Sequence, residues 1–100
     1  MKQNISEEQA KELDELNNSA LEMILGDISD IGAMYSDLAP MVTIGKMIEI
    51  LESKLIEMIS PNTSNKNWVV RIKIDNQMMT IKRECFCECL FVAIKYVLEV

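Results

Sequence analysis

The sequence predicts an α+β fold in which N-terminal helices and a C-terminal helix pack on a two-stranded antiparallel hairpin. Residues 67–83 alternate apolar and polar side chains around an Asp-Asn turn, and residues 84–98 are apolar around most of a helix. Before them, apolar residues recur at spacings of three and four. With 100 residues, 49% of them hydrophobic and 26% charged, the chain forms a single domain. We divide it into an acidic helical region (1–39), an amphipathic helix (43–60) and a β-β-α unit (67–100).

The first predicted helix begins at Ser6, because Ser6 and Gln9 have the spacing of a capping box. We expect the five residues before it to be a frayed tail. The apolar stripe continues in phase from Leu13 to Leu38, past Gly26, so one long helix and two shorter helices both fit. Because glycine costs about 1 kcal/mol inside a helix, we favour a break at Gly26, with Asp27 capping the second helix.

The next helix is predicted from Ile44 to Ile59, with Thr43 as its N-cap and Pro61 beyond its end. It is the most clearly amphipathic stretch of the chain. A polar loop over residues 61–66 leads to the hairpin.

The hairpin is predicted from a strict period of two. Inward-facing positions of the first strand are Trp68, Val70, Ile72 and Ile74. The return strand is expected over residues 77–82, with Met79 and Ile81 inward.

The last helix is too apolar to be covered by a hairpin alone. A helix packed on one sheet face hides a stripe about 100–140° wide, whereas only a narrow polar strip interrupts this helix. A two-stranded sheet also leaves two open edges. We therefore expect a homodimer or higher homo-oligomer, formed through a hairpin edge or through a surface comprising Cys87, Phe91, Ile94 and Leu98. The alternative is a monomer whose front helices cover the rest.

The net charge of −6 is concentrated at the front of the chain. Residues 1–39 contain nine Asp and Glu against two Lys, and the remaining residues are nearly neutral. Direct nucleic-acid binding is therefore not expected, since it requires a basic surface. We interpret Glu12, Asp14 and Glu15 as a surface that docks on a host protein.

Four basic residues lie in or beside the hairpin: Arg71, Lys73, Lys82 and Arg83. Two readings stay open. They form a solvated, edge-protecting sheet face, or they form an anion site for a phosphate-bearing small molecule such as a nucleotide.

The chemistry-bearing residues favour binding over catalysis. The chain has no histidine, and no glycine-rich phosphate loop or tuned carboxylate stands out, so we expect neither an enzyme nor a cofactor. Cys85, Cys87 and Cys89 are interpreted as buried thiols rather than metal ligands. We find no secretory signal and no apolar run of membrane-spanning length, and expect reduced thiols in the cytoplasm, that of the host cell if the chain is phage-encoded.

Residues 41–100 resemble small phage and prophage proteins of the phage ABA sandwich type. The resemblance lies in the helix TIGKMIEIL (43–51), the strand opening NWVV (67–70) and the closing helix around LFVAIK (90–95). It implies a sheet sandwiched between helices and a phage-related role, with no catalytic residues. Our leading hypothesis is a non-enzymatic, acidic phage or mobile-element accessory factor acting on a host protein. The alternatives are a nucleotide sponge or sensor, and a structural assembly subunit.

Overall fold

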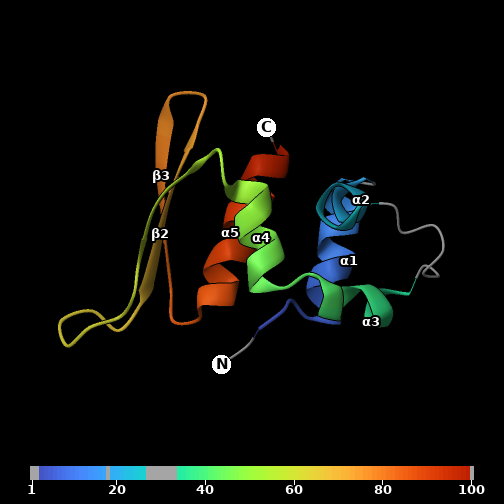
Figure 1. The fold of residues 1–100 in the computed structure, drawn as a ribbon, viewed down its shortest axis with the longest axis horizontal. Helices are drawn as coiled ribbons and strands as arrows, with labels where there is room; N and C mark the ends of the chain where they lie inside the picture. The colour runs from blue at the N-terminus through green and yellow to red at the C-terminus, as the bar shows by residue number, and fades with distance from the viewer. Residues whose placement is uncertain (1–2, 18, 27–33, 100) are drawn as a thin grey trace.

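The protein is built in three layers, which Figure 1 shows from left to right as the sheet, α4 with α5, and α1 to α3. The computed structural model describes residues 3–17, 19–26 and 34–99 and confirms the α+β class. Its elements are α1 (Glu7–Leu16), α2 (Ala20–Leu25), α3 (Tyr35–Leu38), the 3₁₀ turn η1 (Ala39–Met41), α4 (Ile44–Leu51), β1 (Leu55–Ile59), β2 (Trp68–Ile74), β3 (Gln77–Arg83) and α5 (Phe86–Glu99).

Residues 3–5 are anchored, although they were predicted to belong to a frayed tail. Asn4 forms an isolated antiparallel bridge with Thr43, and the Ile5 amide donates to the Val42 carbonyl at 3.1 Å. Ile5 is only 1% exposed, because it immediately precedes the Ser6 cap and its side chain joins the core. The capping box of Ser6 and Gln9 is formed as predicted.

The front helical region breaks earlier than expected. α1 ends at Leu16, and the Ser19 amide donates to Asn17 Oδ1 at 2.9 Å, a local bond that competes with helix continuation. The predicted stop at Gly26 is confirmed, since Gly26 adopts φ 83° and its amide caps α2 through the Glu22 carbonyl. Asp27, the predicted cap of a second helix, lies outside the described residues.

The helix predicted for residues 44–59 is half helix and half strand. α4 begins at Ile44 under the Thr43 cap, as expected, but ends at Leu51. Residues 55–59 form β1, which pairs antiparallel with β2, so the sheet has three strands in the order β1-β2-β3 rather than two. If residues 55–59 were helical, backbone groups along this edge of β2 would lack these hydrogen-bond partners. The pairing begins next to β1, where the Lys73 amide donates to the Lys54 carbonyl at 2.8 Å.

The β2–β3 hairpin has the predicted turn. Asp75 and Asn76 both have positive φ, as a two-residue type I′ turn requires, and pairing is continuous from Ile74–Gln77 to Trp68–Arg83. Val70, Ile72 and Ile81 are buried on the inner face. Val69 is also buried, although it was expected to face outward; it lies in register between Ile59 and Lys82 on the other face.

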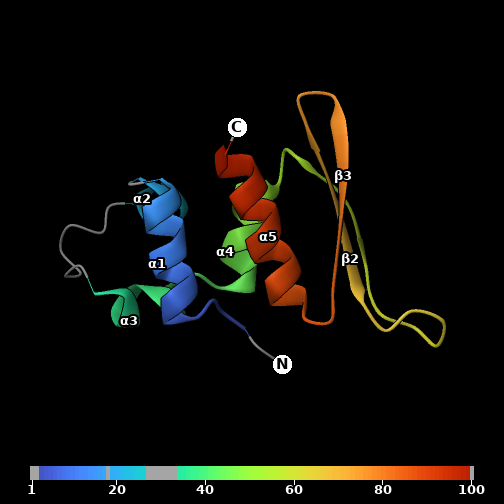
Figure 2. The same ribbon diagram turned by 180° about the vertical axis from the view of Figure 1, so that it is seen from behind.

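The middle layer explains why α5 is so apolar. α5 packs over β2 and β3 on one side, and it also contacts α4 and α1 (Figures 1 and 2). At its start, the Phe86 ring stacks on Trp68 with centroids 4.5 Å apart. Much of the cover that the sequence required is thus supplied within a single chain. The described helices all lie on one side of the sheet, whereas the sandwich resemblance implied helices on both sides.

Candidate functional site

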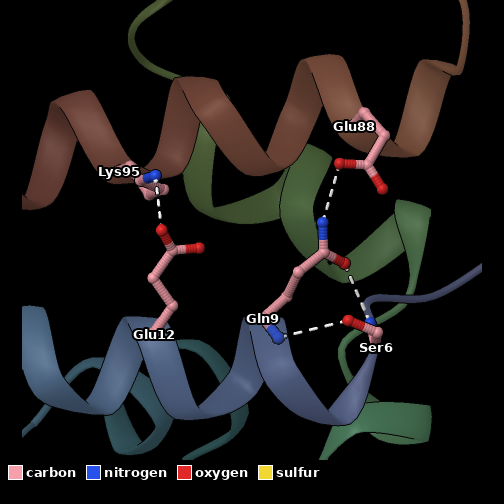
Figure 3. A network of polar contacts seen from close by, with 5 residues as sticks. All are labelled: Ser6, Gln9, Glu12, Glu88 and Lys95. Atoms are coloured by element: carbon pink, nitrogen blue, oxygen red, sulfur yellow. Dashed lines mark hydrogen bonds and ion pairs between the residues drawn. The ribbon is translucent and has the colours of Figure 1, made fainter.

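The acidic face of α1 turns toward α5 rather than only toward solvent. Lys95 Nζ lies 2.9 Å from Glu12 Oε1, and Gln9 Nε2 donates to Glu88 Oε2 at 2.7 Å (Figure 3). The same Gln9 side chain accepts from the Ser6 amide, so one residue both caps α1 and ties it to α5. Glu12, predicted as part of a docking surface, therefore holds two helices together.

Asp14 is also engaged inside the chain. Tyr35 Oη donates to Asp14 Oδ2 at 2.6 Å, which connects α1 to α3. This hydrogen bond, together with the neighbouring negative charge, raises the pKa of the Tyr35 hydroxyl above its ordinary value. Of the three carboxylates predicted to capture a partner, Glu12 and Asp14 bind side chains of other helices, whereas Glu15 lies exposed at the surface.

A hollow lies beside this contact, and no sequence pattern indicated it. It has a volume of about 470 Å³ and is lined by Ser6, Glu7, Glu8, Lys11 and Tyr35. Its two carboxylates and one ammonium lie at the solvated surface. The hollow forms where α3 approaches the start of α1, and this approach could not be predicted from the sequence.

Three of the four predicted anion-binding residues share one surface, the outer face of the sheet. Arg71 and Lys73 are alternate residues of β2, and Lys82 lies opposite Val69 on β3, diagonal to Arg71. All three are exposed. Arg83 pairs with Trp68 and belongs to the other face, and its guanidinium donates to the Lys82 carbonyl at 2.7 Å. The four residues therefore do not form one cluster.

Among the described residues, the carboxylate of Glu57 forms an ion pair with this basic face. Glu57 on β1 pairs in register with Arg71, and their side chains form an ion pair at 3.3 Å. Both side chains are nearly half exposed, so the pair contributes little to stability. It does orient the guanidinium along the sheet.

The predicted oligomer surface on α5 is largely buried within one chain. Cys87 and Ile94 are completely buried and Phe91 is 4% exposed, while Leu98 is half-buried. Lys95 lies 5.4 Å above the Phe91 ring and helps to cover it. In this conformation, these residues belong to the core.

The cysteines also belong to the core. Cys89 Sγ donates to the Trp68 carbonyl at 3.4 Å, and burial raises the pKa of the Cys89 thiol. Cys87 is buried and Cys85 half-buried, and all three are free thiols. Within the described ranges, no group of three His, Cys, Asp or Glu residues is arranged to hold a metal ion.

Comparisons with protein-family models, with curated proteins and with solved structures find no match. None of the helices in the described part of the chain is long and apolar enough to cross a membrane. The geometry alone therefore identifies the candidate site, which is the outer sheet face with Arg71, Lys73 and Lys82.

Proposed function

We propose that this protein is a non-enzymatic binding module whose outer sheet face docks on an acidic surface of a partner protein. One observation carries the proposal: Arg71, Lys73 and Lys82 stand exposed on a sheet face that the described helices leave uncovered (Figure 1). An antiparallel sheet commonly packs one face on the core and leaves the other solvated and polar. Here the open face concentrates one sign of charge.

The contrast with the rest of the chain strengthens the proposal. The protein carries a net charge of −6, yet the outer face has three cations and the single carboxylate of Glu57. Such segregation orients the protein as it approaches a charged partner, and it raises the association rate more than the affinity. An acidic partner would be attracted to the sheet and repelled by the front helices.

The spread of the cations favours a protein over a nucleotide. Alternate residues of a strand lie about 7 Å apart, and Arg71 already has Glu57 as a partner. Arg83, which a compact phosphate site would need, lies on the opposite face. We assign docking to the sheet face instead of Glu12 and Asp14, because those carboxylates have partners within the chain. The resemblance to phage proteins is the reason for placing the partner in a host cell.

The test compares two variants with the same change in net charge. In the first, Arg71, Lys73 and Lys82 are each replaced by Glu. In the control, Lys11, Lys46 and Lys66 are replaced by Glu; all three are exposed and lie outside the three strands. Proteins captured by each tagged variant from host extract are quantified by mass spectrometry, at low and high salt, after thermal melts establish that both variants fold.

We expect a partner captured by the wild type and the control variant, lost in the outer-face variant and weakened by salt. Capture that survives all three outer-face reversals would disprove this function. A thermal shift with ATP or inorganic phosphate, abolished by Arg71→Ala and Lys73→Ala, would instead support the nucleotide sponge or sensor.

A further inference from the structure

Along β3, backbone hydrogen-bonding groups point alternately toward β2 and toward the outer edge of the sheet. The position of the turn fixes which residues point which way. In a two-residue hairpin, the residues that flank the turn form a hydrogen-bonded pair, here Ile74 and Gln77. Residues 73 and 78 then form a non-bonded pair, in agreement with the Lys73 amide, which donates to Lys54 on the β1 side. By the same alternation, the amide and carbonyl groups of Met78, Thr80 and Lys82 point away from β2, at the edge of the sheet.

These three residues are symmetric about Thr80. If two copies of β3 pair antiparallel with Thr80 opposite Thr80, Met78 of one copy lies opposite Lys82 of the other. Met78, Thr80 and Lys82 are the residues whose amide and carbonyl groups point away from β2. Each of these pairs between the two copies can therefore form two backbone hydrogen bonds. Met79 and Ile81 then face each other across the axis on the inner, apolar face.

The charges along β3 are compatible with this arrangement. Antiparallel pairing about Thr80 places Arg83 of each copy opposite the neutral Gln77 of the other, and Lys82 opposite the neutral Met78. Glu84 falls opposite the neutral Asn76, so the nearest opposed pairs include no like charges.

α5 has an apolar stripe on its free flank that fits the same partner. Cys85 and Val92 are half-buried and Tyr96 is 36% exposed, at spacings of seven and four residues that align them along the helix. The stripe lies between Cys89, which contacts the sheet, and the strip of Glu88 and Lys95, which contacts α1. Because α5 lies over β2 and β3, this flank adjoins the β3 edge.

We propose that a second copy of this chain pairs antiparallel with β3 about Thr80, so that the two sheets become one and the two α5 flanks meet. Strands lie about 4.8 Å apart, so helices centred over β2 and β3 of each copy would be separated by about 10 Å, the distance of packed helices. The other edge is less suited, since β1 has five residues, a register shift at Ile56 and a nearby Pro61. This dimer does not depend on the docking partner of the outer face.

Two substitutions at the axis test the pairing. Thr80→Lys opposes two cations and should weaken the dimer at least about fivefold. Thr80→Pro removes two amide donors at the axis and should weaken it roughly thirtyfold, while sparing the hairpin, because this amide does not face β2. Thr63→Lys in the exposed loop before β2 is the matched control for charge. Native mass spectrometry and light scattering measure the mass relative to the 11.4 kDa chain.

Amide hydrogen exchange on the wild type supplies a test that needs no variant. The dimer predicts that the Thr80 and Lys82 amides become protected as protein concentration rises. A wild-type monomer would overturn the proposal, as would a dimer in which these two amides exchange as rapidly as in dilute solution. A dimer that persists unchanged in both Thr80 variants would overturn it as well. Since no partner protein is added, failure here would leave the proposed docking function standing.

Discussion

Lys95 of α5 lies 2.9 Å from the carboxylate of Glu12 on α1, and its ammonium group also lies 5.4 Å from the centre of the Phe91 ring. One cation therefore joins the outer and middle helical layers and covers an aromatic ring of the core. Together with the Gln9–Glu88 hydrogen bond, it turns part of the acidic front helix into an attachment surface (Figure 3). Only part of the negative charge of this helix is available to another molecule.

Exchanging the charges of Glu12 and Lys95 should preserve stability, whereas Glu12→Lys alone should lower it by about 1 kcal/mol, because the pair is half exposed. That loss corresponds to a fall in melting temperature of about 4–8 °C for a domain of this size. Denaturant unfolding of the single and double variants measures the coupling. Glu15→Lys, on the same helix, is the control and should change stability less. Equal losses for Glu12→Lys and Glu15→Lys would mean that the pair does not hold the layers together.

The largest error of sequence reasoning concerns residues 52–59, and its cause is physical. Leu55, Met58 and Ile59 continue the helical stripe of α4, so periodicity alone favours one long helix. In the structure, the same residues form β1, because an otherwise open edge of β2 needs hydrogen-bond partners. Ile56, which the helical stripe leaves on its polar side, was a local sign of another structure. The β2–β3 hairpin was predictable because its turn and alternation are both local signals.

Proline substitution distinguishes the strand from the predicted helix. Glu57 pairs with Arg71, whose backbone faces β1, so Glu57→Pro removes a sheet hydrogen bond. The backbone groups of Met58 point to the free edge, where proline is tolerated. We expect Glu57→Pro to destabilise the protein by at least about 1 kcal/mol more than Met58→Pro, as measured by thermal and urea unfolding. A continuous helix over 44–59 would be disrupted by both.

The site residues were only partly predictable, because their partners are distant in sequence. The partner of Glu12 lies 83 residues away, and no local pattern connects the two. The polar strip on α5 was a usable sign: Glu88 and Lys95 interrupt an apolar helix at a spacing that aligns them, and they face α1 rather than open solvent. Conversely, the outer-face positions of Arg71, Lys73 and Lys82 follow from strand alternation alone, and the structure agrees with them.

A substitution at Phe91 tests whether the predicted oligomer surface on α5 belongs to the core of one chain. Because Phe91 is buried among residues of its own chain, Phe91→Ala should cost about 3–5 kcal/mol of unfolding free energy. Met23→Ala on α2 removes a side chain that is 57% exposed and should cost far less. Both are measured by denaturant unfolding at low protein concentration, where any dimer has dissociated. A Phe91→Ala variant with wild-type stability that only changed oligomer mass would restore the predicted interface.

Stability should decline at alkaline pH through two groups whose pKa values are raised in the folded state. Burial raises the pKa of Cys89, and the hydrogen bond to Asp14 raises that of Tyr35. The unfolded thiol ionises near pH 8.5 and the unfolded phenol near pH 10, so each contribution is complete below that pH and is lost as the pH rises through the folded value. Urea unfolding between pH 7 and pH 11 should show a loss that begins near pH 8.5. Cys89→Ala should remove its early part and Tyr35→Phe its later part, because each variant lacks one of the two ionisations. A decline of the same shape in both variants would assign the alkaline loss to other groups.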